Sequence, residues 1–294
     1  MEIFDNKNNS KSTKFAKKRD RNAEDFSSNQ KSHHSDINFK KSLGQNFIFD
    51  KNLLRAIAVA GEVNNTDTIL EIGAGAGTLT EVLSEMAKKV ISFEIDESLK
   101  PRLNELNKNH PNIEFHFQDF MQADLDNLFT GEARVIANIP YYITTPIIFK
   151  LVEKIEKFKS ILVLVQREVA ERFASDCGNK NYGITSVILQ AKFDVTIPRV
   201  VKKECFTPAP KVDSALVKLV PHNKYKFSDF EGFKKFVHLA FSMRRKTLIN
   251  NLKNVYEKDA LIEKLNKLGL SENVRPEEIS VENFIKLFEN LKNN

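Results

Sequence analysis

The chain has no tryptophan and only two cysteines, Cys177 and Cys205, among its 294 residues. The two cysteines show neither a Cys-x-x-Cys nor a Cys/His spacing, so the sequence contains no zinc motif and no disulfide framework. Apolar runs long enough to cross a bilayer are also absent. The amino terminus lacks the apolar core of a secretory signal and is too acidic for a typical transit peptide. We therefore expect a cytoplasmic protein without a metal site or membrane segment.

Charge is only mildly biased, since 45 basic residues face 39 acidic ones for a net charge of +6. This excess is a weak indication of a polyanionic partner. Residues 1–38 are polar and basic, and they carry too little apolar surface to fold, so we expect a disordered tail. Two interpretations of the tail remain open: it contacts nucleic acid, or it only adds solubility. Its candidate cations are Lys14, Lys17, Lys18, Arg19 and Arg21.

Strand and helix patterns alternate from Phe39 to residue 222. Strand patterns occupy residues 68–73, 90–95, 113–117, 134–138, 160–166, 194–200 and 214–220. Helical patterns occupy residues 51–60, 80–89, 97–106, 167–173 and 184–193, with another helix beginning at residue 145. This alternation predicts an α/β, Rossmann-like domain over residues 39–222, with helices on both faces of a mostly parallel sheet and an antiparallel edge.

Only helical patterns follow residue 222, at residues 230–241, 246–252, 259–268 and 280–291. Their apolar residues recur at the three- and four-residue spacing of amphipathic helices. The sequence therefore predicts a small, all-helical carboxy-terminal domain over residues 223–294.

A glycine-rich loop, E-I-G-A-G-A-G at residues 71–77, separates the first predicted strand from a helix. Glycine lets the backbone turn sharply and approach a ligand, and the carboxyl ends of parallel strands form a binding crevice. The spacing is not that of dinucleotide-binding folds, and the loop lacks the lysine of a P-loop. A tight turn without a ligand is the alternative interpretation.

Two further strand ends carry acids that suit the same crevice. Glu94 lies about twenty residues beyond Gly73, where a carboxylate accepts both ribose hydroxyls. Asp119 follows the third strand, where it can accept a hydrogen bond from an adenine amine. No phosphate clamp accompanies them, so the crevice suits an adenosine that carries a sulfonium, S-adenosylmethionine. We expect Glu71 either to order the loop or to lie near the ammonium of the methionine part.

The fourth strand ends in N-I-P-Y-Y at residues 138–142, a corner that proline holds extended. The side-chain oxygen of Asn138 and the backbone carbonyl of Pro140 can accept hydrogen bonds from the amine of a base, while Tyr141 offers a flat face for stacking. This pattern predicts methylation of a base amine. A simple proline turn would explain Pro140 but neither the amide nor the tyrosine.

These motifs, with others between Lys41 and Leu287, resemble the rRNA adenine N6-dimethyltransferases. The shared segments are K-S-L-G-Q-N-F, E-I-G-A-G-A-G-T-L-T, N-I-P-Y-Y-I-T-T-P, Q-R-E-V-A-E-R, Y-G-I-T-S-V-I-L-Q, F-T-P-A-P-K-V-D-S and R-R-K-T-L. The resemblance implies a class I methyltransferase domain and cofactor contacts at Asn46, Ile48, Gly73, Glu94, Asp119 and Asn138. It also places Gln45 in a segment that closes over the cofactor, and it favours Phe206 as the second face around a flipped base over a plain core role.

Within that family the segments G-Q-N-F and R-P-E-E-I-S-V-E-N-F resemble the small-subunit enzymes. The resemblance then implies dimethylation of two adjacent adenosines near the 3′ end of 16S rRNA in an immature 30S subunit. The sequence gives no reason to expect an oligomer, so we expect a monomer. Three alternatives are a 23S rRNA dimethylase of the macrolide-resistance type, a DNA adenine methylase, and an assembly factor that acts mainly by binding.

Cations in S-M-R-R-K-T-L suggest a contact with RNA phosphates. The candidates are Arg244, Arg245 and Lys246, and Lys202, Lys203 and Lys211 would extend the path past Phe206. A solvated basic face is the ordinary alternative.

Overall fold

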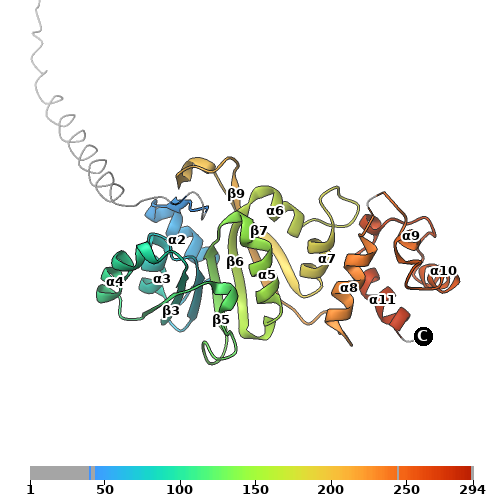
Figure 1. The fold of residues 1–294 in the computed structure, drawn as a ribbon, viewed down its shortest axis with the longest axis horizontal. Coiled ribbons are helices and arrows are strands. Elements are labelled where there is room, and N and C mark those ends of the chain that lie inside the picture. The colour runs from blue at the N-terminus through green and yellow to red at the C-terminus, as the bar shows by residue number, and fades with distance from the viewer. Residues whose placement is uncertain (1–39, 41–43, 244, 293–294) are drawn as a thin grey trace, which may run out of the picture. The chain divides into compact units, whose positions relative to one another are not determined.

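The computed structural model describes residues 40, 44–243 and 245–292. A mixed β-sheet with the strand order β4-β3-β2-β5-β6-β9-β7 forms its centre (Figure 1). The strands are β2 (Thr68–Ile72), β3 (Lys89–Glu94), β4 (Ile113–Phe117), β5 (Ala133–Asn138), β6 (Phe158–Gln166), β7 (Phe193–Val201) and β9 (Ser214–Pro221). All seven strands that the sequence predicts are confirmed, with shifts of one or two residues at their ends.

The sheet is parallel from β4 to β6, and β9 runs antiparallel to both β6 and β7. The middle strands are apolar on both faces; in β6, residues 160–165 are all buried. Such continuous apolar runs are typical of strands that helices cover on both sides. The predicted α/β class with an antiparallel edge is therefore confirmed.

Helices α2 (Lys51–Ala60) and α3 (Thr78–Met86) pack on one face of the sheet, against a core that includes Ile69 and Ile136. Helices α5 (Thr144–Val152) and α6 (Arg167–Phe173) pack on the other face, against Leu70 and Val135. Neighbouring residues of one strand thus point to opposite cores, as the period of two requires. The remaining helices of this region are α4 (Lys100–Asn109) and α7 (Ile184–Gln190).

Three predicted helices differ from the observed ones by three residues at one end or both. Helix α3 ends at Met86 because Ala87 is already extended, which turns the chain into β3. The segment predicted as a helix over residues 97–106 begins with a 3-10 turn, η2 (Glu97–Leu99), and α4 follows it from Lys100. Helix α7 ends at Gln190, shortly before β7.

The carboxy-terminal region contains α8 (Phe230–Ala240), α9 (Leu248–Leu252), α10 (Lys258–Lys267) and α11 (Val281–Lys292), as the sequence predicts. Their core is rich in phenylalanine, with Phe233, Phe236 and Phe284 buried together. Val187 and Ile188 of α7 belong to the same core. Because one helix of the predicted first domain completes the core of the second, the boundary at residue 222 stays a prediction. The predicted tail, residues 1–38, lies outside the described residues.

One pairing was not predicted: β1 (Phe47–Ile48) joins β8 (Phe206–Thr207) in an antiparallel pair. This pairing attaches residues 44–48, called here the covering segment, beside the carboxyl ends of the sheet strands. No helix in the described part of the chain is long and apolar enough to cross a membrane.

Candidate active site

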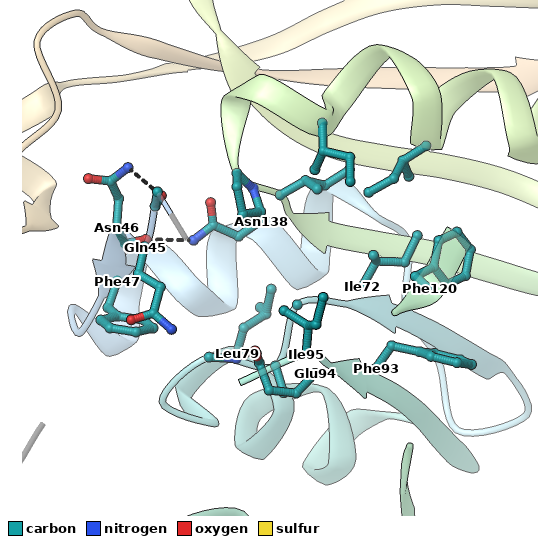
Figure 2. A pocket seen from close by; sticks show the side chains of 18 of the residues that line it. Gln45, Asn46, Phe47, Ile72, Leu79, Phe93, Glu94, Ile95, Phe120 and Asn138 are labelled. Atoms are coloured by element: carbon teal, nitrogen blue, oxygen red, sulfur yellow. Dashed lines mark hydrogen bonds between the residues drawn. The ribbon is translucent and has the colours of Figure 1, made fainter. Parts of the chain in front are cut away.

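A cavity opens where the order of the strands reverses, beside the carboxyl ends of β2 and β5. Ligands of open α/β sheets bind at this kind of switch point. The cavity encloses about 1050 Å³, its solvent-open mouth included. The glycine loop, the ends of β3, β4 and β5, and the covering segment line it. Figure 2 shows Gln45, Asn46 and Phe47 at one end and Phe93 and Phe120 at the other.

The glycine loop owes its shape to left-handed backbone at Gly73 (φ +84°) and Gly75 (φ +56°). The amides of Gly73 and Ala74 both donate to the carbonyl oxygen of Phe93, at 2.8 and 3.0 Å, which ties the loop to β3. A Cβ atom on Gly75 would lie 2.6 Å from the ring of Phe47. The covering segment therefore packs directly on a backbone that tolerates no side chain.

Glu94 ends β3 and is buried. Its Oε2 accepts a hydrogen bond from the Gly75 amide at 2.7 Å, and its Oε1 accepts one from the Asp96 amide at 2.8 Å. Burial raises the pKa of the Glu94 carboxyl, and these backbone donors oppose that rise. The carboxylate thus fixes the loop at the wall of the cavity, where it keeps lone pairs for further donors. Its contact with a ribose stays a prediction.

Asp119 follows β4 and begins a 3-10 turn, η3 (Phe120–Gln122). Its Oδ1 accepts from the Met121 amide at 2.8 Å, while its Oδ2 accepts no hydrogen bond from the described residues. Beside it, the rings of Phe120 and Phe93 meet edge to face, with centroids 5.3 Å apart. A free carboxylate oxygen next to an apolar wall suits the edge of an adenine ring.

Asn138 ends β5, and its Nδ2 donates to the backbone oxygen of Asn46 at 3.0 Å (Figure 2). This bond holds the amide plane and directs Oδ1 away from Asn46. No described residue donates to that oxygen, which remains available as an acceptor at the cavity. The covering segment therefore orients the side chain that the sequence predicts to hold the amine.

The backbone oxygen of Pro140 already accepts hydrogen bonds within the turn that follows it, η4 (Tyr141–Ile143). The donors are the Ile143 amide at 3.2 Å and the Thr144 Oγ1 at 3.5 Å. Ile139 lies between strand and turn, and its carbonyl oxygen accepts no hydrogen bond from the described residues. This corrects the expectation for Pro140, because the free acceptor next to Asn138 is one residue earlier.

Tyr141 lines the cavity, and its hydroxyl forms a 2.6 Å hydrogen bond with Ser214 on β9. Burial raises the pKa of this hydroxyl. Phe206, in contrast, is 3% exposed in the core with Ile48 and Leu216 and does not line the cavity. The structure brings Tyr141 to the site and leaves Phe206 outside it, so a role for Phe206 against a base requires a rearrangement of β8.

Two polar residues that hold the covering segment, Asp96 and Thr78, were not predicted. Gln45 Nε2 donates to Asp96 Oδ2 at 2.8 Å, and Thr78 Oγ1 donates to the backbone oxygen of Ile48 at 2.8 Å. Asn46 turns its own amide back to the Gly44 oxygen at 3.1 Å. Asp96 lies two residues beyond the end of β3, and Thr78 begins α3. Their positions next to the carboxyl ends of the strands were the sequence signal that could have identified them.

Glu71 is fully buried and does not line the cavity. Its Oε2 accepts from Thr80 Oγ1 at 2.7 Å and from Ser92 Oγ at 2.6 Å, while its Oε1 has no partner in the described part of the chain. Of the two roles expected for it, this geometry supports ordering of α3 and β3 behind the loop. Burial raises the pKa of the carboxyl to about 7.

This shift makes stability depend on pH. Because the pKa of Glu71 is about 7 in the folded protein and 4.5 ordinarily, the folded state binds the proton more tightly, and stability falls as pH rises between these values. Between pH 5 and 8, the free energy of unfolding should drop by about 2–3 kcal/mol more in the wild type than in Glu71→Gln. Urea unfolding at several pH values measures this, with the exposed Glu85→Gln as control. Parallel profiles for wild type and Glu71→Gln would contradict it.

The predicted RNA-contacting cations are only partly brought together. Arg244 lies outside the described residues, and Lys246 is exposed. Arg245 lines a separate groove with Arg172 and Lys180. Among the cations expected to extend the path, Lys202 forms an ion pair with Asp213 at 2.8 Å, and Lys203 and Lys211 are exposed.

The charges of the cavity indicate the kind of ligand it takes. Its lining includes the carboxylates of Glu94 and Asp119 but no lysine, arginine or histidine among the described residues. The described part of this lining therefore offers no side-chain cation to pair with a nucleotide phosphate. An adenosine with a positively charged sulfonium and ammonium fits this wall, so the chemistry of the donor set is compatible with S-adenosylmethionine.

A seven-stranded sheet of this order, with one antiparallel strand inserted beside its edge and a cavity at the switch point, is typical of class I methyltransferases. Residues 36–293 match the family model described as ribosomal RNA adenine dimethylase. The chain belongs to this family, and it is an S-adenosylmethionine-dependent rRNA adenine dimethyltransferase.

Individual relatives agree with this assignment. The chain is 40% identical over 261 residues to the ribosomal RNA small subunit methyltransferase A of Levilactobacillus brevis, covering 84% of this chain and 88% of that one. Among solved structures, it is similar to a dimethyladenosine transferase from Plasmodium falciparum (29% identity, TM-score 0.73, 82% of this chain and 95% of that one). It is also similar to the 23S rRNA methyltransferase ErmE (27% identity, TM-score 0.68, 84% of this chain and 100% of that one).

Proposed function

We propose that this enzyme dimethylates the N6 amines of two adjacent adenosines near the 3′ end of 16S rRNA, within an immature 30S subunit. The identities of 40% and 41% to relatives named ribosomal RNA small subunit methyltransferase A support this substrate. The observation that carries the chemistry is the amide of Asn138, which the Asn46 carbonyl turns so that its oxygen faces the cavity.

The corner at residues 138–141 acts on an adenine that has left its own stack. Tyr141 supports the ring, and Asn138 Oδ1 and the Ile139 carbonyl oxygen accept the two hydrogens of the N6 amine. The adenine ring draws the lone pair of this nitrogen into its π-system, and the two acceptors favour lone-pair density on the nitrogen itself. S-adenosylmethionine supplies a methyl group on a sulfonium, a leaving group that needs no acid. The nitrogen–carbon bond forms as the carbon–sulfur bond breaks, and the amine proton leaves to solvent afterwards. Catalysis rests on positioning and preorganised acceptors.

Binding of cofactor is assigned to the remaining residues of the cavity. Glu94 accepts the ribose hydroxyls, Asp119 accepts the adenine amine, and Gly73 lets the backbone approach the ligand. Asn46 and Ile48 close the cavity through the covering segment. We further propose that the enzyme works in the cytoplasm as a monomer. Its ribosomal substrate and its two free, exposed cysteines are compatible with that location.

The decisive experiment offers labelled S-adenosylmethionine to under-methylated 30S particles and, separately, to protein-free 23S rRNA. Mapping the label to nucleotides should find dimethyladenosine only in the particles, near the 3′ end of 16S rRNA. Label in 23S rRNA would instead favour a resistance-type methylase. Binding to the particles without any transfer would favour an assembly factor.

Contacts with RNA phosphates should show as a salt dependence. Replacing both Arg245 and Lys246 by alanine should weaken binding to 30S particles and lower the slope of log affinity against log salt by about 1–2 units. Lys267→Ala removes one exposed cation paired with Glu263 and serves as control. Filter binding at several salt concentrations measures the slopes. Slopes for the double variant and the control that equal the wild-type slope would exclude these phosphate contacts.

A further inference from the structure

Lys150, on α5, holds the far end of the turn that carries Asp119. Its Nζ donates to the backbone oxygen of Met121 at 2.7 Å and to that of Ala123 at 2.8 Å. The same Nζ lies 5.6 Å from the centroid of the Phe120 ring. The ammonium thus lies close to Phe120 and Met121 within η3 and to Ala123 at its end, and its hydrogen-bond partners are neutral carbonyls, not an acid. A half-buried lysine with this set of partners fixes a backbone position.

The turn that Lys150 holds needs such support. A three-residue 3-10 turn has little stability of its own, so contacts at its ends set its position. Asp119 caps the amino end through Met121, and Ala123 ends the turn at the side where Lys150 donates. Cations at the carbonyl end of a helical turn are favourable, since the carbonyl groups there have no partner of their own. Asp119 begins this turn, Phe120 lies in it, and both line the cavity, so the position of the turn sets the position of both residues.

Lys150 also joins the two halves of the site. Helix α5 follows directly after η4, the turn of the methyl-accepting corner. The ammonium of Lys150 contacts the segment after β4, and β2 and β3 separate β4 from β5 in the sheet. We propose that Lys150 is a positioning residue that sets the distance between the adenine-binding wall at Asp119 and the corner at Asn138. This inference rests on the proposed function, because the contact of Asp119 with adenine is part of it.

A neighbouring lysine offers a matched control. Lys154, one turn further along the chain, forms an ion pair with Asp126 at 2.6 Å, outside the cavity. Ion pairs between exposed side chains contribute little to stability. Lys154→Met therefore removes the same charge from the same neighbourhood without touching η3.

The test measures binding of two ligands by calorimetry: S-adenosylhomocysteine and its purine analogue that lacks the 6-amino group. Lys150→Met should lower the affinity for S-adenosylhomocysteine about tenfold, which is the scale of one well-placed hydrogen bond. It should lower the affinity for the deamino analogue less than about threefold. Lys154→Met should bind both ligands as the wild type does. Lys150→Arg keeps donors for both carbonyls and should retain discrimination between the ligands. In the Asp119→Asn background, Lys150→Met should have little further effect.

The outcomes separate this inference from the proposed function. If the wild-type chain binds neither ligand, the proposed function fails whatever Lys150 does. If the wild type binds and Lys150→Met binds equally well, the positioning role is overturned. Equal weakening of both ligands, or additive losses with Asp119→Asn, would show a general defect of the cavity and overturn it as well. Should Lys150→Met unfold, Lys150→Gln, which keeps one donor, is expected to show the same selective loss to a smaller degree.

Discussion

Asn138→Ala is expected to lower the rate of methyl transfer by about 10²–10³-fold at saturating cofactor, the usual cost of removing one preorganised hydrogen-bonding group from a transition state. The reason is local: Oδ1 of Asn138 is the free side-chain acceptor at the end of β5, and alanine leaves one hydrogen of the amine unpartnered. Single-turnover transfer to under-methylated 30S particles measures the chemical step without product release.

Cofactor affinity should change much less in this variant. The loss of the bond from Nδ2 to the Asn46 carbonyl costs about 1 kcal/mol, which corresponds to a factor of roughly five in the binding of S-adenosylhomocysteine. Asn112→Ala is a suitable control, because Asn112 also donates to two backbone oxygens, those of Ser84 at 2.9 Å and Ala87 at 3.2 Å, but lies outside the cavity. Equal losses of transfer and cofactor binding in Asn138→Ala would contradict the division of roles.

The second large effect should follow from Gly75→Ala, which is expected to weaken cofactor binding about 100-fold. The new methyl group would lie 2.6 and 2.9 Å from two carbons of the Phe47 ring, and the left-handed backbone adds its own strain. Left-handed conformation costs about 1–2 kcal/mol in a residue with a Cβ, and overpacking typically costs about 1–3 kcal/mol. Calorimetric titration with S-adenosylhomocysteine measures the loss.

Gly178→Ala separates strain from clash. Gly178 has φ +83°, and a Cβ there would meet nothing within 4 Å. That variant should lose some thermal stability but keep cofactor affinity, whereas adding Phe47→Ala to Gly75→Ala should recover part of the binding. If both glycine variants bind the cofactor as the wild type does, the packing of Phe47 on the loop has no role in binding.

The sequence predicts well those helices, strands and turns whose formation depends on neighbouring residues in the chain. All seven sheet strands follow from apolar runs between turn residues, and the cap of α2 follows from Asp50, whose side chain accepts from the Asn52 amide at 2.8 Å. The glycine loop and the acids at successive strand ends were predictable for a related reason. Parallel strands bring their carboxyl ends to one edge whatever the distant sequence does.

Features that depend on distant partners escaped prediction. The antiparallel pair of β1 and β8 joins two residues near the start of the α/β region to two residues near its end. Two residues are too few to show the alternating hydrophobic pattern of a strand. It buries Phe206, which sequence alone leaves balanced between core and site. Engagement of the Pro140 carbonyl depends on how η4 winds, and the role of Lys150 depends on the loop after β4. In each case the residue was visible in the sequence, but the distant or turn-dependent partner of its backbone or side chain was not.

The bond between Asn46 and Asn138 has a consequence for how the two methyl groups are added. Each S-adenosylmethionine delivers one methyl group, so each dimethylated adenosine consumes two cofactors, and the covering segment must release its hold between them. Because the same segment orients Asn138, exchange of the spent cofactor also loosens the grip on the amine. The enzyme is thereby reset after every transfer. The bond between Asn46 and Asn138 therefore has to form again before the second methyl group is transferred to the same nitrogen.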